Sequence, residues 1–341
     1  MRRGLLSWSE TEVPPAVLED RLARLRGRMA NEGLDALLVY TNFPRPAAVS
    51  YLTHFVPYWS QGMLIVPPEG APVLAVSLSK RVSNWIRETA HVSEIINTPN
   101  LGKELAACLK SGGHIRVGAV ELNRLPGAVI NTLEAEYPDI ELTDSTALYQ
   151  DFRATADETE IALSRRATEI ARTALALATP GDAPVQADIL SAIERAARMA
   201  GCEEILIDVA EDLAADGRFR RLDGPTAFKD RYAVRLSVAY KGHWVRLARS
   251  FDQRWPKDRA NELEAHITSA AGSAVASGLP DFSTGPIGLE ACIGTLPLQS
   301  IVKPAAGQIV SVNRTWHDEE GAWLASDPVL VGSDGKSAQP L

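Results

Sequence analysis

The sequence has few cysteines and no surplus of positive charge, and both features exclude classes of protein. Its three cysteines, Cys108, Cys202 and Cys292, are widely spaced, and no two of them form a CxxC pair. We therefore expect a reducing compartment, with neither a disulfide framework nor a cysteine-ligated zinc site. The formal net charge of −8 lacks the basic footprint of a nucleic-acid-binding protein.

Long hydrophobic runs are missing as well. The first ten residues, MRRGLLSWSE, contain two arginines but only a very short apolar stretch. They predict neither a signal peptide nor a membrane span, so we expect a cytoplasmic protein with no membrane partner. The 341 residues, 45% hydrophobic and 23% charged, are typical of a globular protein with two domains.

The pattern of apolar residues changes near residue 150. Before that point, helix-like and strand-like stretches alternate along the chain. The spacing predicts a helix over 16–32 that Gly33 ends, a buried strand over 34–40, and two strands within 63–76. This alternation indicates an α/β domain over residues 1–150 with a largely buried sheet.

Residues 151–341 follow a different order of two helices, strands, a helix and strands. The helices are predicted over 156–181, 186–200 and 260–278, and the strands over 205–251, 309–316 and 323–331. Pro180-Gly181 ends the first helix and Gly201 the second. This order indicates an α+β domain with helices packed on one face of a mostly antiparallel sheet.

Residues 231–251, RYAVRLSVAYKGHWVRLARSF, predict a hairpin that carries arginines on one face. A two-residue turn at Lys241-Gly242 would pair Tyr240 with His243 and Ser237 with Arg246. Alternation then places Arg235 and Arg246 on the same face, diagonal to one another. The opposite face is apolar and is expected to pack on helices. The arginine face itself is either a solvated strand face or part of a cleft.

Several motifs in the right order resemble one known family. They are RLARLRGRMANEGLDALLVY (21–40), VSYLTHF (49–55), DETEIALSRRA (157–167), the hairpin, GPIGLEACIG (285–294), KPAAGQIVSVN (303–313) and GAWLASDPVLVGSDG (321–335). Over nearly its full length the chain resembles the pita-bread family of methionine aminopeptidase, aminopeptidase P, prolidase and creatinase. The resemblance implies a creatinase-like α/β domain at 1–150 and an α+β pita-bread domain at 151–341.

The chain departs from this family at the metal-binding positions. Peptidases of the family hold two divalent metal ions with two Asp, one His and two Glu. The matching positions here are Arg235, Arg246, Gly285 or Pro286, Asn313 and Ser326. None is a carboxylate or imidazole, and two are cations that would repel a dication. Asp327 alone does not rebuild the set, so we expect no metal and no cofactor.

Two guanidinium groups in place of metal ligands suit an anion, because Arg presents a planar fork to carboxylate or phosphate. That anion is either a substrate carboxylate or an internal partner such as Glu290 or Asp327. Creatinase and ectoine hydrolase, two branches of this fold that the chain resembles, cleave C–N bonds in small zwitterions. The resemblance therefore implies a metal-independent hydrolase of an amide, amidine or ureido bond in a small anionic or zwitterionic molecule.

Two alternatives stay open. One is a catalytically inactive relative that acts as a small-molecule-binding or scaffold protein, since the fold alone does not fix the function. The other is a metal-free lyase or isomerase that abstracts a proton beside a carboxylate held by the arginines.

Three residues are candidate catalytic groups. Cys292 occupies a position where the family has a histidine and would act as a thiolate nucleophile, or else is an inert buried thiol. Glu290 would act as an acid–base group, and His317 as a general base through a water molecule. Asn313, Ser326, Asp327 and Trp316 complete the expected substrate-binding set with the two arginines.

The N-terminal domain of two-domain relatives often reaches the partner's active site across a dimer. The resemblance therefore implies a homodimer in which Arg45, Tyr58 and Trp59 contact substrate in the partner's cleft, although a surface-loop role is equally open. Arg218, Arg220 and Arg221 lie either in a solvated loop or at further anion contacts.

Overall fold

The computed structural model describes residues 8–57, 59–180, 188–221, 227–254, 282–284, 305–319, 321–335 and 337–341. These residues form two compact units that divide between Ala154 and Thr155. No helix in the described part of the chain combines the length and the apolar character needed to cross a bilayer.

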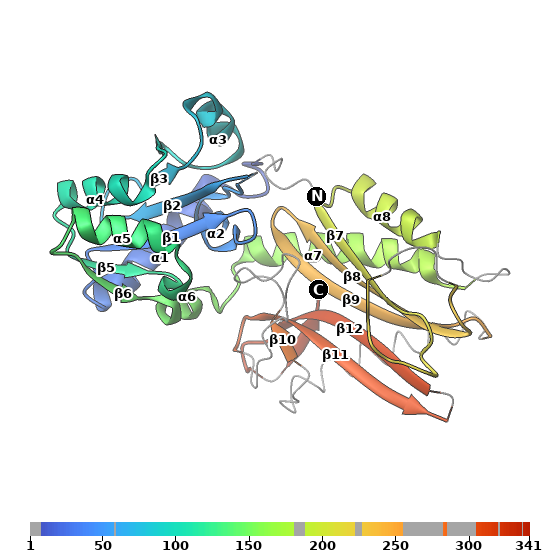
Figure 1. The fold of residues 1–341 in the computed structure, drawn as a ribbon. Helices are drawn as coiled ribbons and strands as arrows, with labels where there is room; N and C mark the ends of the chain where they lie inside the picture. The colour runs from blue at the N-terminus through green and yellow to red at the C-terminus, as the bar shows by residue number, and fades with distance from the viewer. Residues whose placement is uncertain are drawn as a thin grey trace. The chain divides into compact units, whose positions relative to one another are not determined.

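The N-terminal unit is built on one mixed sheet of six strands (Figure 1). The strands are β1 (Ala36–Asn42), β2 (Gln61–Val66), β3 (Val73–Val76), β4 (Glu94–Asn97), β5 (Arg116–Ala119) and β6 (Glu141–Asp144). Their order is β4-β3-β2-β1-β5-β6. β2 runs antiparallel to its neighbours β1 and β3, and the other pairs are parallel.

Helices cover both faces of this sheet. They are α1 (Pro15–Asn31), α2 (Ala47–Thr53), α3 (Ser83–Thr89), α4 (Leu101–Gly112), α5 (Gly127–Glu136) and α6 (Thr146–Arg153), with 3-10 turns at Lys80–Val82 and Leu122–Arg124. Side chains of α1, α2, α3 and α6 pack on one face and those of α4 and α5 on the other. The predicted α/β class is confirmed, because the central strands β1, β2 and β3 bury apolar side chains on both faces.

The first helix shows how the sequence specifies these elements. Leu18, Leu22, Leu25 and Met29 repeat at helical spacing, and all four are buried against the sheet. The helix was predicted to end at Gly33, and the backbone there adopts a left-handed φ of 66°. Glycine takes this conformation without steric cost, so the chain turns into β1 at this point.

The C-terminal unit contains a second sheet. Its elements are α7 (Glu158–Leu175), a 3-10 turn (Ala176–Ala178), α8 (Ile189–Met199), β7 (Glu204–Ala210), β8 (Arg231–Tyr240), β9 (His243–Asp252), β10 (Phe282–Thr284), β11 (Ile309–Asp318), β12 (Gly321–Val331) and β13 (Ala338–Pro340). The strand order is β10-β11-β12-β9-β8-β7, and β13 pairs with β12. Neighbouring strands are antiparallel, as predicted.

Helices α7 and α8 pack on one face of this sheet (Figure 1). Asp157 and Glu160 form a capping box that fixes the start of α7. The apolar face of the predicted hairpin lies in the same buried cluster as the helices, and it comprises Tyr232, Val234, Leu236, Val238, Val245 and Leu247. The predicted helix at 260–278 lies outside the described residues.

Candidate functional site

The hairpin forms with the predicted register. Lys241 and Gly242 have φ values of 50° and 79°, and two successive positive φ angles are those of a type I′ turn. This turn matches the right-handed twist of β8 and β9, so the strands pair Tyr240 with His243 and Ser237 with Arg246. The predicted shared face of Arg235, Ser237 and Arg246 is confirmed, because the Arg246 Nε donates to Ser237 Oγ at 3.1 Å.

Strand register brings distant parts of the sequence into one row across the sheet. The row consists of Asn313, Ser326, Ala248, Arg235 and Asp208. Directly opposed residues share a face, and this face is opposite to the one that packs on α7 and α8. We call this surface the arginine face and define it by Asp208, Arg235, Ser237, Arg246, Asn313 and Ser326. Four of the five positions that the sequence resemblance predicts to correspond to metal ligands lie on it.

Arg235 is fixed by two neighbours. Its Nε and Nη2 atoms donate to one oxygen, Asp208 Oδ2, at 3.1 and 2.9 Å. The guanidinium carbon also lies 4.5 Å from the centre of the Phe219 ring, which is cation–π geometry. The side chains are 26% exposed for Arg235 and 21% for Asp208, so solvent reaches the pair. The internal partner of Arg235 is therefore Asp208.

Arg246 is held through both its side chain and its backbone. Besides the bond to Ser237, its carbonyl oxygen accepts hydrogen bonds from Ser311 Oγ at 3.2 Å and Ser326 Oγ at 3.5 Å. The two serine hydroxyls lie 3.2 Å apart and are buried. These hydrogen bonds connect β9 to β11 and β12 within the part of the sheet that carries the arginine face.

Asp327 makes its contacts elsewhere. Its carboxylate accepts hydrogen bonds from Arg249 Nη1 at 3.1 Å and from Arg249 Nη2 at 2.8 Å, and both side chains are buried. Asp327 neighbours Ser326 in the strand, so alternation places it on the opposite face. The predicted internal partnership of Asp327 with Arg235 and Arg246 is corrected by this placement, because one residue of offset reverses the side of the sheet.

Among the candidate catalytic groups, only His317 lies within the described part of the chain. It is exposed on β11 and pairs with Ala322. It shares its face with Asn313 but lies four residues further along, or about 13 Å at strand spacing. Trp316 pairs with Trp323 in the same strands. Cys292, Glu290 and Tyr58 lie outside the described residues.

Two of the three candidate contacts in the N-terminal unit, Arg45 and Trp59, are at least partly exposed. Arg45 Nη1 is 3.6 Å from Glu121 Oε2, and Trp59 is 51% exposed. Both belong to the segments that follow β1 and α2.

The loop after β7 folds back over the sheet. Val209 and Arg220 form an isolated β-bridge, and Phe219 packs beside an apolar patch that comprises Ala210, Leu213, Ala233, Ala322 and Leu324. Arg218 and Arg220 both pair with Asp216, and these bonds lower the pKa of Asp216 to about 2. Arg218 and Arg220 thus have an internal partner in this exposed loop, and a role in anion contacts stays a prediction.

Two contributors to the site were missed in the sequence, Asp208 and Phe219. A signal for Asp208 was present, since it is the one acidic residue inside the otherwise apolar stretch ILIDVA. A carboxylate in such a strand needs a cationic partner. Phe219 gave no signal, because its loop precedes the hairpin by several residues and has no strand periodicity.

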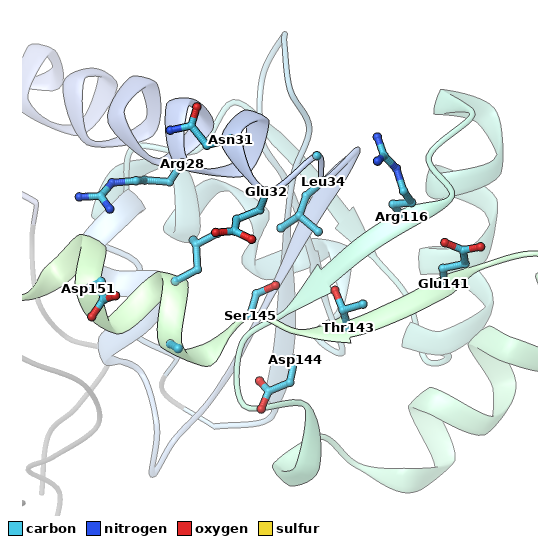
Figure 2. Close-up of a pocket in the computed structure, with 13 residues that line it drawn as sticks. Arg28, Asn31, Glu32, Leu34, Arg116, Glu141, Thr143, Asp144, Ser145 and Asp151 are labelled. Atoms are coloured by element: carbon cyan, nitrogen blue, oxygen red, sulfur yellow. The ribbon is translucent and has the colours of Figure 1, made fainter.

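A separate pocket of about 540 Å³ lies in the N-terminal unit, between the end of α1, strand β6 and α6. Figure 2 shows Arg28 and Arg116 on opposite sides of it, with Glu32 and Ser145 between them. Asp144 in its wall accepts hydrogen bonds from Thr146, which lower the pKa of Asp144. No predicted site residue lines this pocket.

Comparison with known proteins agrees with the fold. Residues 21–155 match the sequence model of the creatinase/prolidase N-terminal domain. The chain is a divergent protein of the creatinase/prolidase fold. No curated protein matches its sequence.

Solved structures of similar fold cover nearly the whole chain. An Xaa-Pro dipeptidase from Bacillus anthracis is 18% identical, with a TM-score of 0.67 and coverage of 94% of this chain and 97% of that one. An X-Pro aminopeptidase from Thermotoga maritima is 14% identical, with a TM-score of 0.71 and coverage of 94% and 96%. A prolidase from Pyrococcus horikoshii is 16% identical, with a TM-score of 0.67 and coverage of 94% and 97%. The predicted fold class, a creatinase-like α/β domain followed by an α+β pita-bread domain, is thereby confirmed.

The side chains on the arginine face do not fit the dinuclear metal centre of the pita-bread peptidases. Such a centre needs hard anionic or imidazole donors, whereas this face offers guanidinium, hydroxyl and amide groups, and its one carboxylate already accepts two hydrogen bonds from Arg235. In the described part of the chain, no cluster of three or more His, Cys, Asp or Glu side chains is arranged to hold a metal ion.

Proposed function

We propose that this protein of the creatinase/prolidase fold is a metal-independent hydrolase of a C–N bond in a small carboxylate-bearing molecule. The observation that carries the proposal is the placement of Arg235 and Arg246 on one sheet face. The sequence resemblance predicts that both positions correspond to metal ligands of the peptidases. A guanidinium group provides there the positive charge that a metal ion would provide, and it suits a carboxylate.

The substrate carboxylate would bind at the arginine face and orient the scissile bond. Asn313 lies in the same row as Arg235 and offers an amide for a neutral polar group of the substrate. Ser326 lies beside it, but its buried hydroxyl contacts Ser311 and would hold the strands in place. Hydrolysis adds water across the C–N bond, so that oxygen joins the carbon and the amine leaves with a proton. Positioning of the substrate against a water molecule is the contribution we assign to these residues.

The groups that activate the water or attack the carbon stay predictions. Cys292 and Glu290 are the candidates from the GPIGLEACIG segment, and His317 is the candidate from β11. Arg45, Tyr58 and Trp59 are proposed to contact the substrate from the partner subunit of a homodimer, for which the exposed ring of Trp59 gives support.

A second candidate function is supported by the Asp208–Arg235 pair. An internal carboxylate already neutralises one arginine, as in a fold that has lost its chemistry but keeps its structure. The protein would then bind a small molecule or act as a scaffold without turnover. A lyase or isomerase is the third candidate and differs from a hydrolase in its products.

Turnover of a library of small amides, amidines and ureido compounds, followed by mass spectrometry, separates these candidates. A hydrolase gives products whose summed mass exceeds the substrate by one water, whereas a lyase or isomerase does not. We expect turnover that survives chelator treatment and falls about 10- to 100-fold in Arg235→Ala and in Arg246→Ala, since each removes a charged hydrogen-bond donor. Turnover that requires added metal ions would overturn the proposal, and ligand binding without product would favour the second candidate.

A further inference from the structure

The bond between Arg235 and Asp208 uses only one edge of the guanidinium. Both hydrogen bonds come from the Nε and Nη2 atoms, and both end on Asp208 Oδ2. Within the described part of the chain, Nη1 has no acceptor. The end formed by Nη1 and the outer hydrogen of Nη2 therefore remains available to another planar acceptor.

Two contacts together fix the plane of this guanidinium. Asp208 pairs directly with Arg235 across β7 and β8, so the bond joins two rigid backbone positions. The Phe219 ring lies against the guanidinium at 4.5 Å and opposes its rotation out of that plane. Arg has several rotatable bonds, and fixing it in advance reduces the entropy lost when a ligand binds.

The residues beside Arg235 on the arginine face are apolar and buried. Ala233 and Leu324 belong to the buried patch next to Phe219, and Ala248 fills the row between Arg235 and Ser326. A ligand therefore reaches Arg235 through the part of its side chain that is exposed.

We infer that Asp208 is a positioning residue that fixes Arg235 so that the Nη1 end of its guanidinium binds a carboxylate. This inference rests on the proposed function and names the group that selects its substrate. Phe219 supports the same orientation. Asp208 acts through Arg235 and touches no ligand itself.

Asp208 has a second effect that the test must separate from positioning. Its negative charge repels every monovalent anion near Arg235, so removal of the charge raises the affinity for all of them alike. Positioning instead favours a planar carboxylate over a spherical anion. The ratio of the affinities for acetate and chloride therefore reports positioning and cancels the charge effect.

The experiment follows the Nε–H resonance of Arg235 in protein labelled with ¹⁵N-arginine, assigned with Arg235→Lys, during titration with acetate or chloride. A carboxylate held by one guanidinium is expected to bind at about 10 mM, and chloride about tenfold more weakly. The ratio should fall to about one in Asp208→Ala. Asp208→Asn should keep most of it, because its amide oxygen still accepts from the same edge.

Glu194→Ala is the matched control. Arg198 Nε and Nη2 both contact Glu194 Oε1 at 2.9 Å, the same edge-on geometry, but on α8 at the other side of the sheet. This variant should leave the ratio unchanged. An unchanged ratio in Asp208→Ala would overturn the positioning role and leave carboxylate binding intact. No response of the Arg235 resonance to acetate in the unaltered protein would overturn both the inference and the anion recognition in the proposed function.

Discussion

Glu203 gives the prediction that can be worked furthest from the structure. The residue precedes β7 and is half-buried, but its carboxyl end is enclosed. The Oε1 atom accepts the N–H of Lys241 in the hairpin turn, and Oε2 has no partner in the described part of the chain. Burial is the main cause that raises the pKa of Glu203 to about 8 from the ordinary 4.5.

The sign of the effect follows from this direction. A carboxyl group whose pKa is higher in the folded state stabilises the fold fully below about pH 4.5, and the contribution is lost as the pH rises through about 8. At about 1.4 kcal/mol per pH unit, the free energy of unfolding falls by at most roughly 5 kcal/mol across this window. Above pH 8 the charged carboxylate is buried and the loss is complete.

Glu203→Gln removes this titration while its amide oxygen still accepts the N–H of Lys241. We expect little change in the free energy of unfolding near pH 5 and a gain of several kcal/mol near pH 9, measured by urea denaturation. Glu158→Gln, at an exposed position in the first turn of α7, is the control and should differ from the unaltered protein by less than about 1 kcal/mol at either pH. A gain of equal size at both pH values would refute the reasoning.

Two further predictions concern the stability of the fold. Asp327→Asn should lower the free energy of unfolding by about 3 to 5 kcal/mol, because it leaves the buried Arg249 guanidinium without its counter-charge. The control Glu194→Ala breaks an exposed pair and should lower the free energy of unfolding by no more than about 1 kcal/mol. Equal losses for the two variants in denaturant titrations would contradict this account. Gly242→Ala should destabilise by about 1 kcal/mol because φ is 79° there, whereas Gly27→Ala, within α1 and with open space around its Cβ position, should stabilise by a similar amount. The Tm values of these two glycine variants should move in opposite directions, and shifts of the same sign would show that backbone conformation is not the cause.

The elements whose pattern is local were predictable from the sequence. The hairpin is the best example, since period-two alternation and the Lys241-Gly242 turn together determine its register. The helix over 16–32 followed in the same way from its apolar spacing and Gly33. The helix predicted over 156–181 is shorter, because α7 ends at Leu175 and a 3-10 turn then tightens the backbone.

The partners on the arginine face were less predictable, because they depend on the register between strands far apart in the sequence. Asp208 and Arg235 are 27 residues apart and meet only once β7 has paired with β8. Ser326 and Asp327 illustrate a different difficulty. A shift of one residue in the match to the family exchanges a residue on the arginine face for one on the helix side.

The central claim is that the arginine face binds a carboxylate at positions that resemble metal ligands in the peptidases. A crystal grown with acetate and manganese, with anomalous scattering recorded for the manganese, tests it most directly. The account predicts an acetate within hydrogen-bonding distance of Arg235 Nη1 and no anomalous peak on this face. A manganese ion bound between Arg235, Arg246, Asn313 and Ser326 would contradict it.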